Sequence, residues 1–156
     1  MPIYSMRNTW GGNEISHDLY QYLEANLPEG KTILELGSGW GTSQLMRKWN
    51  VWSIEDRPEW HCKFNEAQSR LVPLKDKWYD PDILENTLTN LKYDLLLVDG
   101  PYDNREGFIT HFSLFNQKVP IVFDDVKRDA GKAIAYSIAV LADRPFVNHN
   151  DVFGVV

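Results

Sequence analysis

A glycine-rich loop near the start of the chain follows closely after a carboxylate. In the stretch T-I-L-E-L-G-S-G-W-G-T-S, residues 32–43, glycines occupy positions 37, 39 and 41, and Glu35 precedes the first of them by two residues. Glycines adopt unusual backbone dihedrals and let a ligand lie close to the main chain. A carboxylate here can accept hydrogen bonds around the cationic amino-acid portion of a ligand, whereas it would repel a pyrophosphate. The loop is therefore expected to hold a ligand with an amino-acid group.

A second group of carboxylates follows two later apolar segments. Asp99 begins D-G-P-Y-D-N-R after the first of these segments, and the pair Asp124 and Asp125 lies in F-D-D-V-K-R after the second. Oxygen ligands gathered in one cleft suit Mg²⁺ or another hard divalent ion, which would bind a substrate hydroxyl and lower its pKa. The same carboxylates could instead cap helices that begin near Asn104 and Asp129. The three aspartates are thus candidate metal ligands, with helix capping as the alternative.

Alternating strand and helix patterns would bring these residues together. Uninterrupted apolar runs such as L-L-L-V, residues 95–98, suit strands that are buried on both faces of a parallel sheet. The C-terminal stretch P-F-V-N-H-N-D-V-F-G-V-V predicts a hairpin that turns at residues 148–151, and Ser16 predicts the cap of a helix that reaches about Asn26. The expected strands cover residues 32–36, 51–55, 70–74, 93–99 and 120–124, and the expected helices cover 42–49, 58–67, 81–90, 105–116 and 129–142.

These elements predict an α/β fold, an open, doubly wound, mostly parallel sheet of seven strands that ends in an antiparallel hairpin. In such a sheet ligands bind at the carboxyl ends of the strands, where the winding reverses beside the first strand. The glycine loop and the aspartates would all lie at that edge. Residues 1–156 are predicted to form one domain, with residues 31–156 as the core and residues 1–30 as an N-terminal helix and lid, in which Trp10 stands beside two glycines.

Composition limits the class of protein. The 156 residues are 43% hydrophobic and 24% charged, as in ordinary soluble proteins, and no segment approaches the roughly 20 apolar residues of a membrane span. The N-terminus lacks the apolar core of a signal peptide, and the lone Cys62 can form neither an internal disulfide nor a CxxC zinc site, which suits the cytoplasm. The net charge of -6 disfavours nucleic acid as a partner. Trp49, Trp52 and Trp60 are expected to leave an apolar patch suited to a homodimer.

Two other ligands of glycine loops are disfavoured by single residues. A P-loop needs a lysine followed by serine or threonine after its last glycine, and W-G-T-S contains no lysine. The dinucleotide fingerprint G-x-G-x-x-G requires glycine or alanine at position 42, where this chain has threonine. A nicotinamide-dependent oxidoreductase is therefore the second enzyme class to consider, not the first.

The stretch E-L-G-S-G-W-G resembles the first motif of the class I S-adenosylmethionine-dependent methyltransferases, acid-x-G-x-G-x-G, and the expected order of strands agrees with that family over nearly the whole chain. The resemblance implies that the glycine loop cradles the methionine part of the cofactor and that Glu55, or Asp56 beside it, binds the ribose hydroxyls. It also implies an adenine contact from residues 74–80, where Asp76 and Trp78 are the candidates. The full set of expected cofactor-binding residues is Glu35, Gly37, Ser38, Gly39, Gly41, Glu55, Asp56, Asp76, Trp78 and Asp99.

The aspartates are similar to those of the metal-dependent O-methyltransferases of the catechol type, which carry an aspartate after strand four and an Asp-Asn pair followed by valine after strand five. Here F-D-D-V supplies aspartate in place of asparagine, and Tyr102 replaces the family's basic lysine. The catalytic residue that accepts the proton therefore stays open among Asp99, Asp125 and His149, the last of which would lie in the terminal hairpin turn. The resemblance implies O-methylation of a small-molecule or glycan acceptor, assisted by Mg²⁺ bound to Asp99, Asp124 and Asp125.

Two alternative functions remain. D-G-P-Y, residues 99–102, differs by one residue from the D-P-P-Y motif of N-methyltransferases, in which the tyrosine stacks on a planar target. The glycine in this stretch and the acidic net charge of the chain weaken that alternative. The other is a non-catalytic subunit that binds the cofactor and activates a partner, which would show cofactor binding without turnover. Arg105, Lys127 and Arg128 follow the same strands and are candidates for binding an acidic substrate, or are solvated loop charges.

Overall fold

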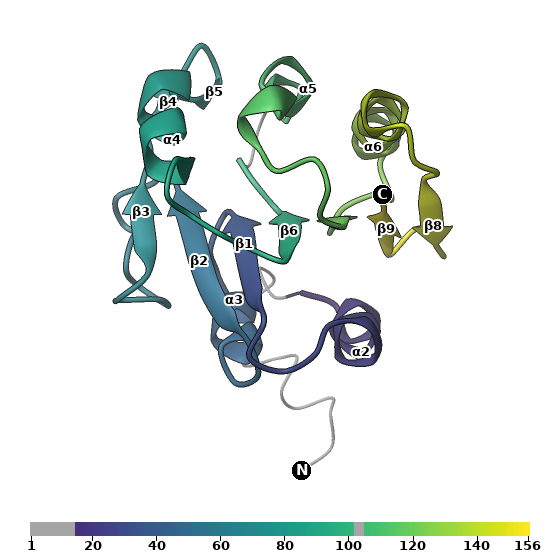
Figure 1. Ribbon diagram of the computed structural model, residues 1–156, viewed down its shortest axis with the longest axis horizontal. Helices are drawn as coiled ribbons and strands as arrows, with labels where there is room; N and C mark the ends of the chain where they lie inside the picture. The colour runs from purple at the N-terminus through teal and green to yellow at the C-terminus, as the bar shows by residue number, and fades with distance from the viewer. Residues whose placement is uncertain (1–14, 102–104) are drawn as a thin grey trace.

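The strands of the molecule are β1 (Thr32–Leu36), β2 (Asn50–Glu55), β3 (Ser69–Leu71), β6 (Leu95–Val98), β7 (Ile121–Phe123), β8 (Val147–His149) and β9 (Phe153–Val155), with a separate pair, β4 (Leu74–Lys75) and β5 (Trp78–Tyr79). The computed structural model describes residues 15–101 and 105–156. The seven strands other than β4 and β5 form one sheet in the order β3-β2-β1-β6-β7-β9-β8 (Figure 1). Strands β3, β2, β1, β6 and β7 pair with one another in parallel, whereas β9 pairs antiparallel with both β7 and β8. The predicted doubly wound α/β sheet with a C-terminal antiparallel hairpin is confirmed.

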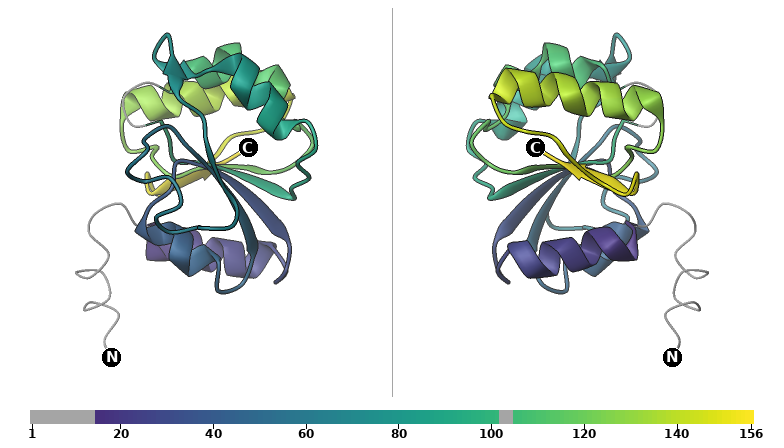
Figure 2. Two further views of the ribbon diagram at one scale, coloured as in Figure 1. Left: turned by 90° about the vertical axis from the view of Figure 1, so that its left-hand side faces the viewer. Right: turned by 90° about the vertical axis from the view of Figure 1, so that its right-hand side faces the viewer.

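The helices are α2 (His17–Asn26), α3 (Trp40–Leu45), α4 (Pro81–Leu88), α5 (Gly107–Thr110), the 3₁₀ helix η1 (Phe112–Leu114) and α6 (Asp129–Ala142). Figure 2 shows α2 and α3 on one face of the sheet and α4, α5 and α6 on the other. Because side chains alternate along a strand, β1 places Ile33 in the layer with Leu19 and Leu23 of α2, and places Leu34 and Leu36 in the opposite layer. The sheet is therefore buried on both faces, as the uninterrupted apolar strands predict.

Local signals set several element boundaries. Ser16 caps α2 as predicted, because its Oγ accepts a hydrogen bond from the Leu19 amide at 3.1 Å. Asp80 caps α4 in the same way, and Pro81 at the first helical position adds a fixed φ. Helix α6 covers the predicted residues 129–142 and ends at Asp143, which adopts the left-handed conformation.

The segment after β2 departs from the sequence-based prediction. Residues 58–67 were expected to be helical, but they form turns. The Asn65 side-chain amide donates to the Val51 carbonyl at 2.8 Å and to the Ser53 hydroxyl at 3.2 Å. These bonds hold the segment against β2, whereas in a surface helix the same side chain would point into solvent. Cys62 lies at a φ of 62°, which an α-helix does not contain. This loop geometry carries Trp60 to the carboxyl ends of the strands.

Three predictions concern residues outside the described part of the chain. These are Trp10 as part of a lid, Tyr102 in the D-G-P-Y stretch, and Asn104 as the start of a helix. Among the residues that the structure does describe, none of the helices is both long enough and apolar enough to cross a membrane.

Candidate active site

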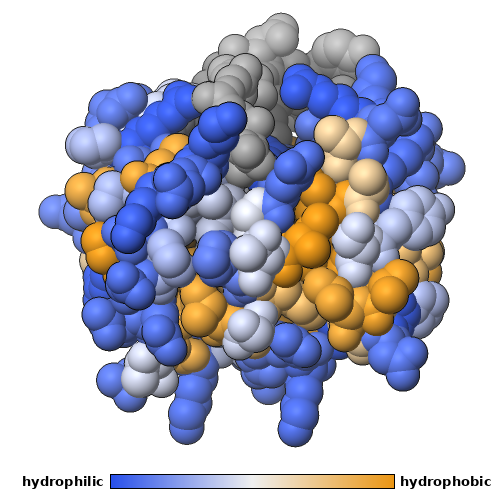
Figure 3. All heavy atoms as spheres, turned by 90° about the horizontal axis from the view of Figure 1, so that it is seen from above, coloured by the Kyte–Doolittle hydropathy of each residue, from blue (hydrophilic) through white to orange (hydrophobic). Residues whose placement is uncertain are grey.

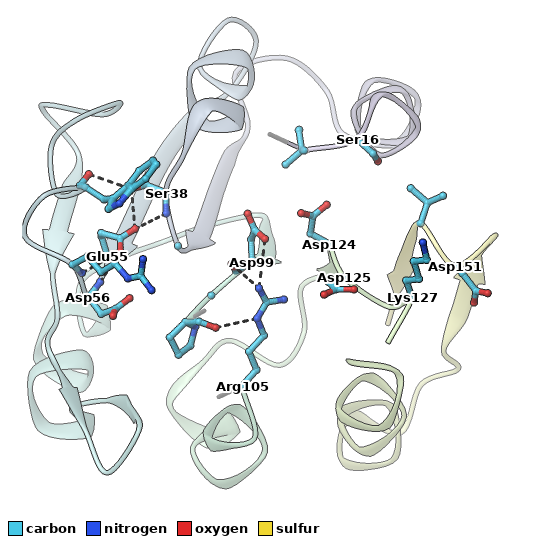
Figure 4. A pocket seen from close by; sticks show the side chains of 17 residues that line it. Ser16, Ser38, Glu55, Asp56, Asp99, Arg105, Asp124, Asp125, Lys127 and Asp151 are labelled. Atoms are coloured by element: carbon cyan, nitrogen blue, oxygen red, sulfur yellow. Dashed lines mark hydrogen bonds and ion pairs between the residues drawn. The ribbon is translucent and has the colours of Figure 1, made fainter. Parts of the chain in front are cut away.

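A cavity of about 680 Å³ lies at the carboxyl ends of the central strands, where the strand order reverses (Figure 4). Its volume is in the range of sites that hold a cofactor or a small ligand. Of the predicted cofactor-binding, metal-binding and catalytic residues, seven line it: Gly37, Ser38, Glu55, Asp56, Asp99, Asp124 and Asp125. Arg105 and Lys127, predicted as possible contacts to an acidic substrate, line it too, whereas Arg128 does not. The other lining residues are Ile15, Ser16, Arg57, Trp60, Gly100, Pro101, Asp151 and Val152. The sheet thus brings both groups of predicted carboxylates to one cavity.

Glu55 ends β2 and is held by its own loop and by the glycine loop. Its Oε2 accepts hydrogen bonds from the Ser38 amide at 2.8 Å and the Ser38 hydroxyl at 3.0 Å. Its Oε1 accepts from the amides of Asp56 and Arg57, both at 3.1 Å. The residue is only 4% exposed, so the carboxylate has one fixed orientation at the cavity wall. A ligand hydroxyl can take the place of the Ser38 hydroxyl on Oε2, because the three backbone donors keep the carboxylate in this orientation.

Gly37 is required at the end of β1 for two reasons. Its φ of 89° lies in the left-handed region, which side chains disfavour. A Cβ at this position would lie 3.0 Å from the Asp99 carbonyl oxygen and 3.2 Å from the Gly100 Cα. The glycine loop therefore packs directly on the backbone that follows β6. Both backbones line the cavity, and together they form a wall without side chains between Ser38 and Asp99.

Glu35 does not line the cavity, contrary to the prediction that it contacts the ligand. The register of β1 and β2 pairs Glu35 with Ser53, and its Oε1 accepts hydrogen bonds from the Ser53 hydroxyl at 2.6 Å and the Thr42 hydroxyl at 2.5 Å. Only 3% of the residue is exposed, and burial raises the pKa of Glu35 to about 7. Its place is behind the glycine loop, where it holds Thr42 at the start of α3.

The second and third glycines of the loop also lie outside the cavity wall. Gly39 precedes α3, and its amide donates to the Thr42 hydroxyl at 3.0 Å. Gly41 is needed for packing, because a Cβ there would lie 2.8 Å from the Ile15 amide nitrogen. Of the predicted glycine-loop contacts, only Gly37 and Ser38 line the cavity. The motif spacing identified the loop but not which of its residues face the ligand.

The predicted adenine contacts, Asp76 and Trp78, are also placed elsewhere. Asp76 is exposed at the turn between β4 and β5, where it and Lys77 have positive φ values. Trp78 is 3% exposed and stacks on His111, with ring centroids 5.2 Å apart and planes within 8°. It also packs so tightly on Gly107 that a Cβ there would come within 2.3 Å of its ring. The β4–β5 hairpin, which the sequence did not predict, turns these two residues away from the cavity.

The acidic residues after β6 and β7 interact with one another. The carboxyl groups of Asp99 and Asp124 lie close enough for each to shift the pKa of the other. Burial, followed by the charge of Asp124, raises the pKa of Asp99 well above its ordinary value, although 29% of its side chain faces the cavity. Burial likewise raises the pKa of Asp124 to about 6. Arg105 opposes this effect, with its guanidinium 3.7 Å from the Asp99 carboxylate and 3.0 Å from the Asp99 carbonyl oxygen (Figure 4).

The predicted metal triad and the predicted catalytic histidine are not assembled here. Within residues 15–101 and 105–156, no three histidine, cysteine, aspartate or glutamate side chains converge as metal ligands, so Asp99, Asp124 and Asp125 do not form a ready metal site. His149 stacks on Phe153, with ring centroids 4.4 Å apart, and lines a separate groove of about 310 Å³ beside α2. From the hairpin it is Asp151 that reaches the cavity, and it pairs with Lys132 at 2.9 Å.

Trp60 lines the cavity, although the sequence predicts it in an apolar surface patch. It was grouped with Trp49 and Trp52 in an apolar patch, but the three side chains do not form one surface. Trp49 is 4% exposed, and its indole N–H donates to the Leu27 carbonyl. The Trp52 ring is covered by the Arg70 guanidinium, whose carbon lies 4.7 Å from the ring centroid. Figure 3 shows apolar side chains on the α4–α6 side of the molecule. Those exposed on α6 are Tyr136, Val140 and Leu141.

Comparison with known proteins identifies the class of fold that this site is built on. No family model and no curated protein matches the chain. Solved structures do match it, and the class they define is the class I methyltransferase fold, with its seven-stranded sheet and antiparallel C-terminal pair. At 13–16% sequence identity these likenesses establish the fold, and the chemistry has to be argued from the cavity.

Three of the similar structures differ in how much of their own chain is matched. The methyltransferase MycE from the mycinamycin biosynthetic pathway, in complex with Mg, SAH and mycinamycin VI, is 13% identical with a TM-score of 0.57; the match covers 88% of this chain and 48% of MycE. A precorrin-6y C5,15-methyltransferase from Geobacter metallireducens GS-15 is 15% identical with a TM-score of 0.53, covering 93% and 90%. A methyltransferase-like protein from Silicibacter pomeroyi DSS-3 is 16% identical with a TM-score of 0.56, covering 92% and 88%. The chain thus spans about half the length of MycE and most of the other two.

Proposed function

We propose that the cavity binds S-adenosylmethionine and that the protein transfers the methyl group to a hydroxyl oxygen of a small-molecule or glycan acceptor. The observation that carries this proposal is the fixed carboxylate of Glu55, which lies beside the backbone wall at Gly37 in a cavity at the switch point of the sheet. The SAH bound in the similar MycE structure supports the choice of cofactor.

The residues on the Glu55 side of the cavity suit an adenosyl group. Glu55 and Asp56 offer carboxylate oxygens to the two ribose hydroxyls, and the indole of Trp60 offers an apolar surface at the same wall. Gly37 and Gly100 present backbone to the cavity, where the sulfur end of the ligand can approach. When bound, S-adenosylmethionine supplies a methyl group activated on a sulfonium. The protein must then orient the acceptor oxygen in line with that methyl group and take up its proton.

The residues on the other side of the cavity are polar and suit a hydroxylated acceptor. Asp124, Asp125 and Lys127 follow β7, and Asp151 of the hairpin lies beyond Lys127 (Figure 4). Asp124 is the group best suited to accept the acceptor's proton, because burial raises its pKa to about 6 and so makes it a stronger base than an ordinary carboxylate. Arg105 holds the neighbouring Asp99 and fixes the pair in place.

A divalent metal does not fit this arrangement. Asp99 already has a cationic partner in Arg105, so a metal ion at Asp99 would compete with that guanidinium. The convergent oxygen ligands that Mg²⁺ requires are not gathered among the described residues. The proton transfer is therefore assigned to the carboxylates alone, and the Mg²⁺ of the MycE complex is not carried over to this chain.

The cofactor assignment is tested by calorimetric titration with S-adenosylhomocysteine. Replacing Glu55 by glutamine removes the charge that strengthens its bonds to the ribose hydroxyls, and we expect affinity to fall about tenfold or more, since hydrogen bonds to charged groups contribute roughly 1.5–3 kcal/mol. Asp76→Asn is the matched control, because Asp76 is an exposed carboxylate outside the cavity. Equal affinity of the Glu55→Gln variant and the wild type would remove the ribose assignment.

A further inference from the structure

The glycine loop connects Glu35 to Glu55 through two sets of hydrogen bonds. Thr42 and Gly39 make the first set, and Ser38 makes the second. The Thr42 hydroxyl donates to Glu35 Oε1 at 2.5 Å and accepts from the Gly39 amide at 3.0 Å. Residue 38, next to Gly39 along the chain, then holds Glu55 through its amide and its hydroxyl at 2.8 and 3.0 Å. The buried carboxylate of β1 is therefore connected to the cavity carboxylate of β2 through the glycine loop.

Thr42 fixes the glycine loop through its side chain but does not line the cavity. It is 1% exposed and lies at the third position of α3, so its hydroxyl bonds back to the amide that precedes the helix, as in half of a capping box. The Thr42 hydroxyl donates its hydrogen bond to Glu35 Oε1, which accepts a second hydrogen bond from the Ser53 hydroxyl at 2.6 Å. Ser53 in turn accepts from Asn65, and within the described part of the chain its hydroxyl makes no hydrogen bond to the glycine loop.

We propose that Thr42 is a positioning residue for the cofactor cavity and that Glu35 acts through Thr42, instead of contacting the cofactor. This inference rests on the proposed function. The Glu35–Thr42–Gly39 bonds hold residues 37–39 in the conformation in which Ser38 orients Glu55. Loss of the Thr42 hydroxyl leaves the Gly39 amide and the Glu35 carboxylate each one partner short, and the loop then has to be ordered when the ligand binds.

Two ligands separate this role from a direct contact. S-Adenosylhomocysteine and 5′-methylthioadenosine share the thioether nucleoside, but only the first carries an amino-acid group. A residue that touches the amino-acid group affects the first ligand alone. A residue that sets the loop and Glu55 affects both ligands by the same factor, because both carry the ribose.

The experiment is calorimetric titration of four variants with both ligands, well below the unfolding temperature of each variant. Thr42→Val keeps the shape of the side chain and should weaken both ligands about tenfold. Thr42→Ser keeps the hydroxyl and should restore affinity. Ser53→Ala is the matched control, because it removes the other hydroxyl from Glu35 but leaves the loop bonds, and it should cost less than about threefold. Glu35→Gln keeps an oxygen acceptor for Thr42 and should change both affinities little.

The outcomes distinguish the inference from the proposed function. Equal weakening of both ligands by Thr42→Val, with rescue by Thr42→Ser, supports the positioning role. Unchanged affinity in Thr42→Val, or a loss confined to S-adenosylhomocysteine in Glu35→Gln, would overturn it while wild-type binding still supports the cofactor. A wild-type protein that binds neither ligand would overturn the proposed function and the inference together.

Discussion

Replacing Glu35 by glutamine should stabilise the protein at alkaline pH and have much less effect at acidic pH. Glu35 is 3% exposed, and burial raises its pKa from the ordinary value of 4.5 to about 7, with the charge of Glu55 adding to the effect and the hydroxyls of Ser53 and Thr42 opposing it. The folded state therefore binds this proton more tightly than the unfolded state does. Stability is lost as the pH rises from about 4.5 to about 7, and above that range the loss is complete.

The size of the effect follows from the two pKa values. The difference between 4.5 and about 7 corresponds to about 3 kcal/mol, and roughly 2–3 kcal/mol of it develops between pH 5 and pH 8. Glutamine carries no charge at either pH and keeps an oxygen that can accept from Thr42 and Ser53. For a chain of 156 residues, this gain corresponds to roughly 5–10 °C in Tm at pH 8.

The assay is urea unfolding followed by tryptophan fluorescence, at pH 5 and pH 8. The quantity to compare is the difference in unfolding free energy between variant and wild type at each pH, because other buried carboxyls such as Asp124 contribute their own pH dependence to both proteins. Glu85→Gln, an exposed glutamate on α4, is the matched control for the removal of one carboxylate. A Glu35→Gln effect of equal size at both pH values would refute the reasoning, because it would mean that Glu35 is ionised or neutral alike in both states.

Two further predictions concern the loop and the metal. Gly37→Ala should lower the unfolding free energy by about 2–4 kcal/mol, because φ is left-handed there and the added Cβ would meet the Asp99 carbonyl. Gly30→Ala should lower it by only about 1 kcal/mol, because φ is similar but no described atom lies within 4 Å of the added Cβ. Equal losses in thermal unfolding would contradict the close packing of the loop. Binding of S-adenosylhomocysteine and any methyl transfer should be unchanged by EDTA, because Asp99 already pairs with the Arg105 guanidinium. Activity that EDTA abolishes and Mg²⁺ restores would instead favour the metal triad.

The fold could be predicted from the sequence because its signals are local and repeated. The apolar run Leu95–Val98 marks a strand buried on both faces, and the capping serine at position 16 and the 129–142 helix were placed correctly. The segment 58–67 was not, because its conformation depends on side-chain bonds from Asn65 to a strand. No periodicity in the sequence reports that contact.

The candidate site could be predicted in part, for a similar reason. Gly37, Glu55 and Asp99 line the cavity because each directly follows or ends a strand, and strand ends can be read from the sequence. The orientation of Glu35 could not, because it depends on the β1–β2 register that places Ser53 beside it. Trp78 was misplaced because the short β4–β5 hairpin that turns it inward has only two residues in each strand, too few for a recognisable pattern.

The contributions of Trp60 and Asp151 to the cavity also depend on tertiary contacts. Trp60 reaches the cavity because the loop after β2 is not a helix, and Asp151 does so because the hairpin packs beside β7 and pairs with Lys132 of α6. The hairpin turn itself was predicted, but the residue expected to reach the cavity, His149, stacks on Phe153 instead. Neighbouring residues in such a turn face different directions, so the register of the hairpin decides which one reaches the ligand.

Calorimetric titration of the wild-type protein with S-adenosylhomocysteine and, separately, with NADH, each with and without Mg²⁺, tests the cofactor assignment most directly. We expect binding of S-adenosylhomocysteine in the micromolar range, independent of Mg²⁺, and no binding of NADH. Such a result would justify a screen of hydroxylated acceptors with labelled S-adenosylmethionine. Binding of NADH, or of neither ligand, would contradict the assignment of the cavity formed by Gly37, Ser38 and Glu55.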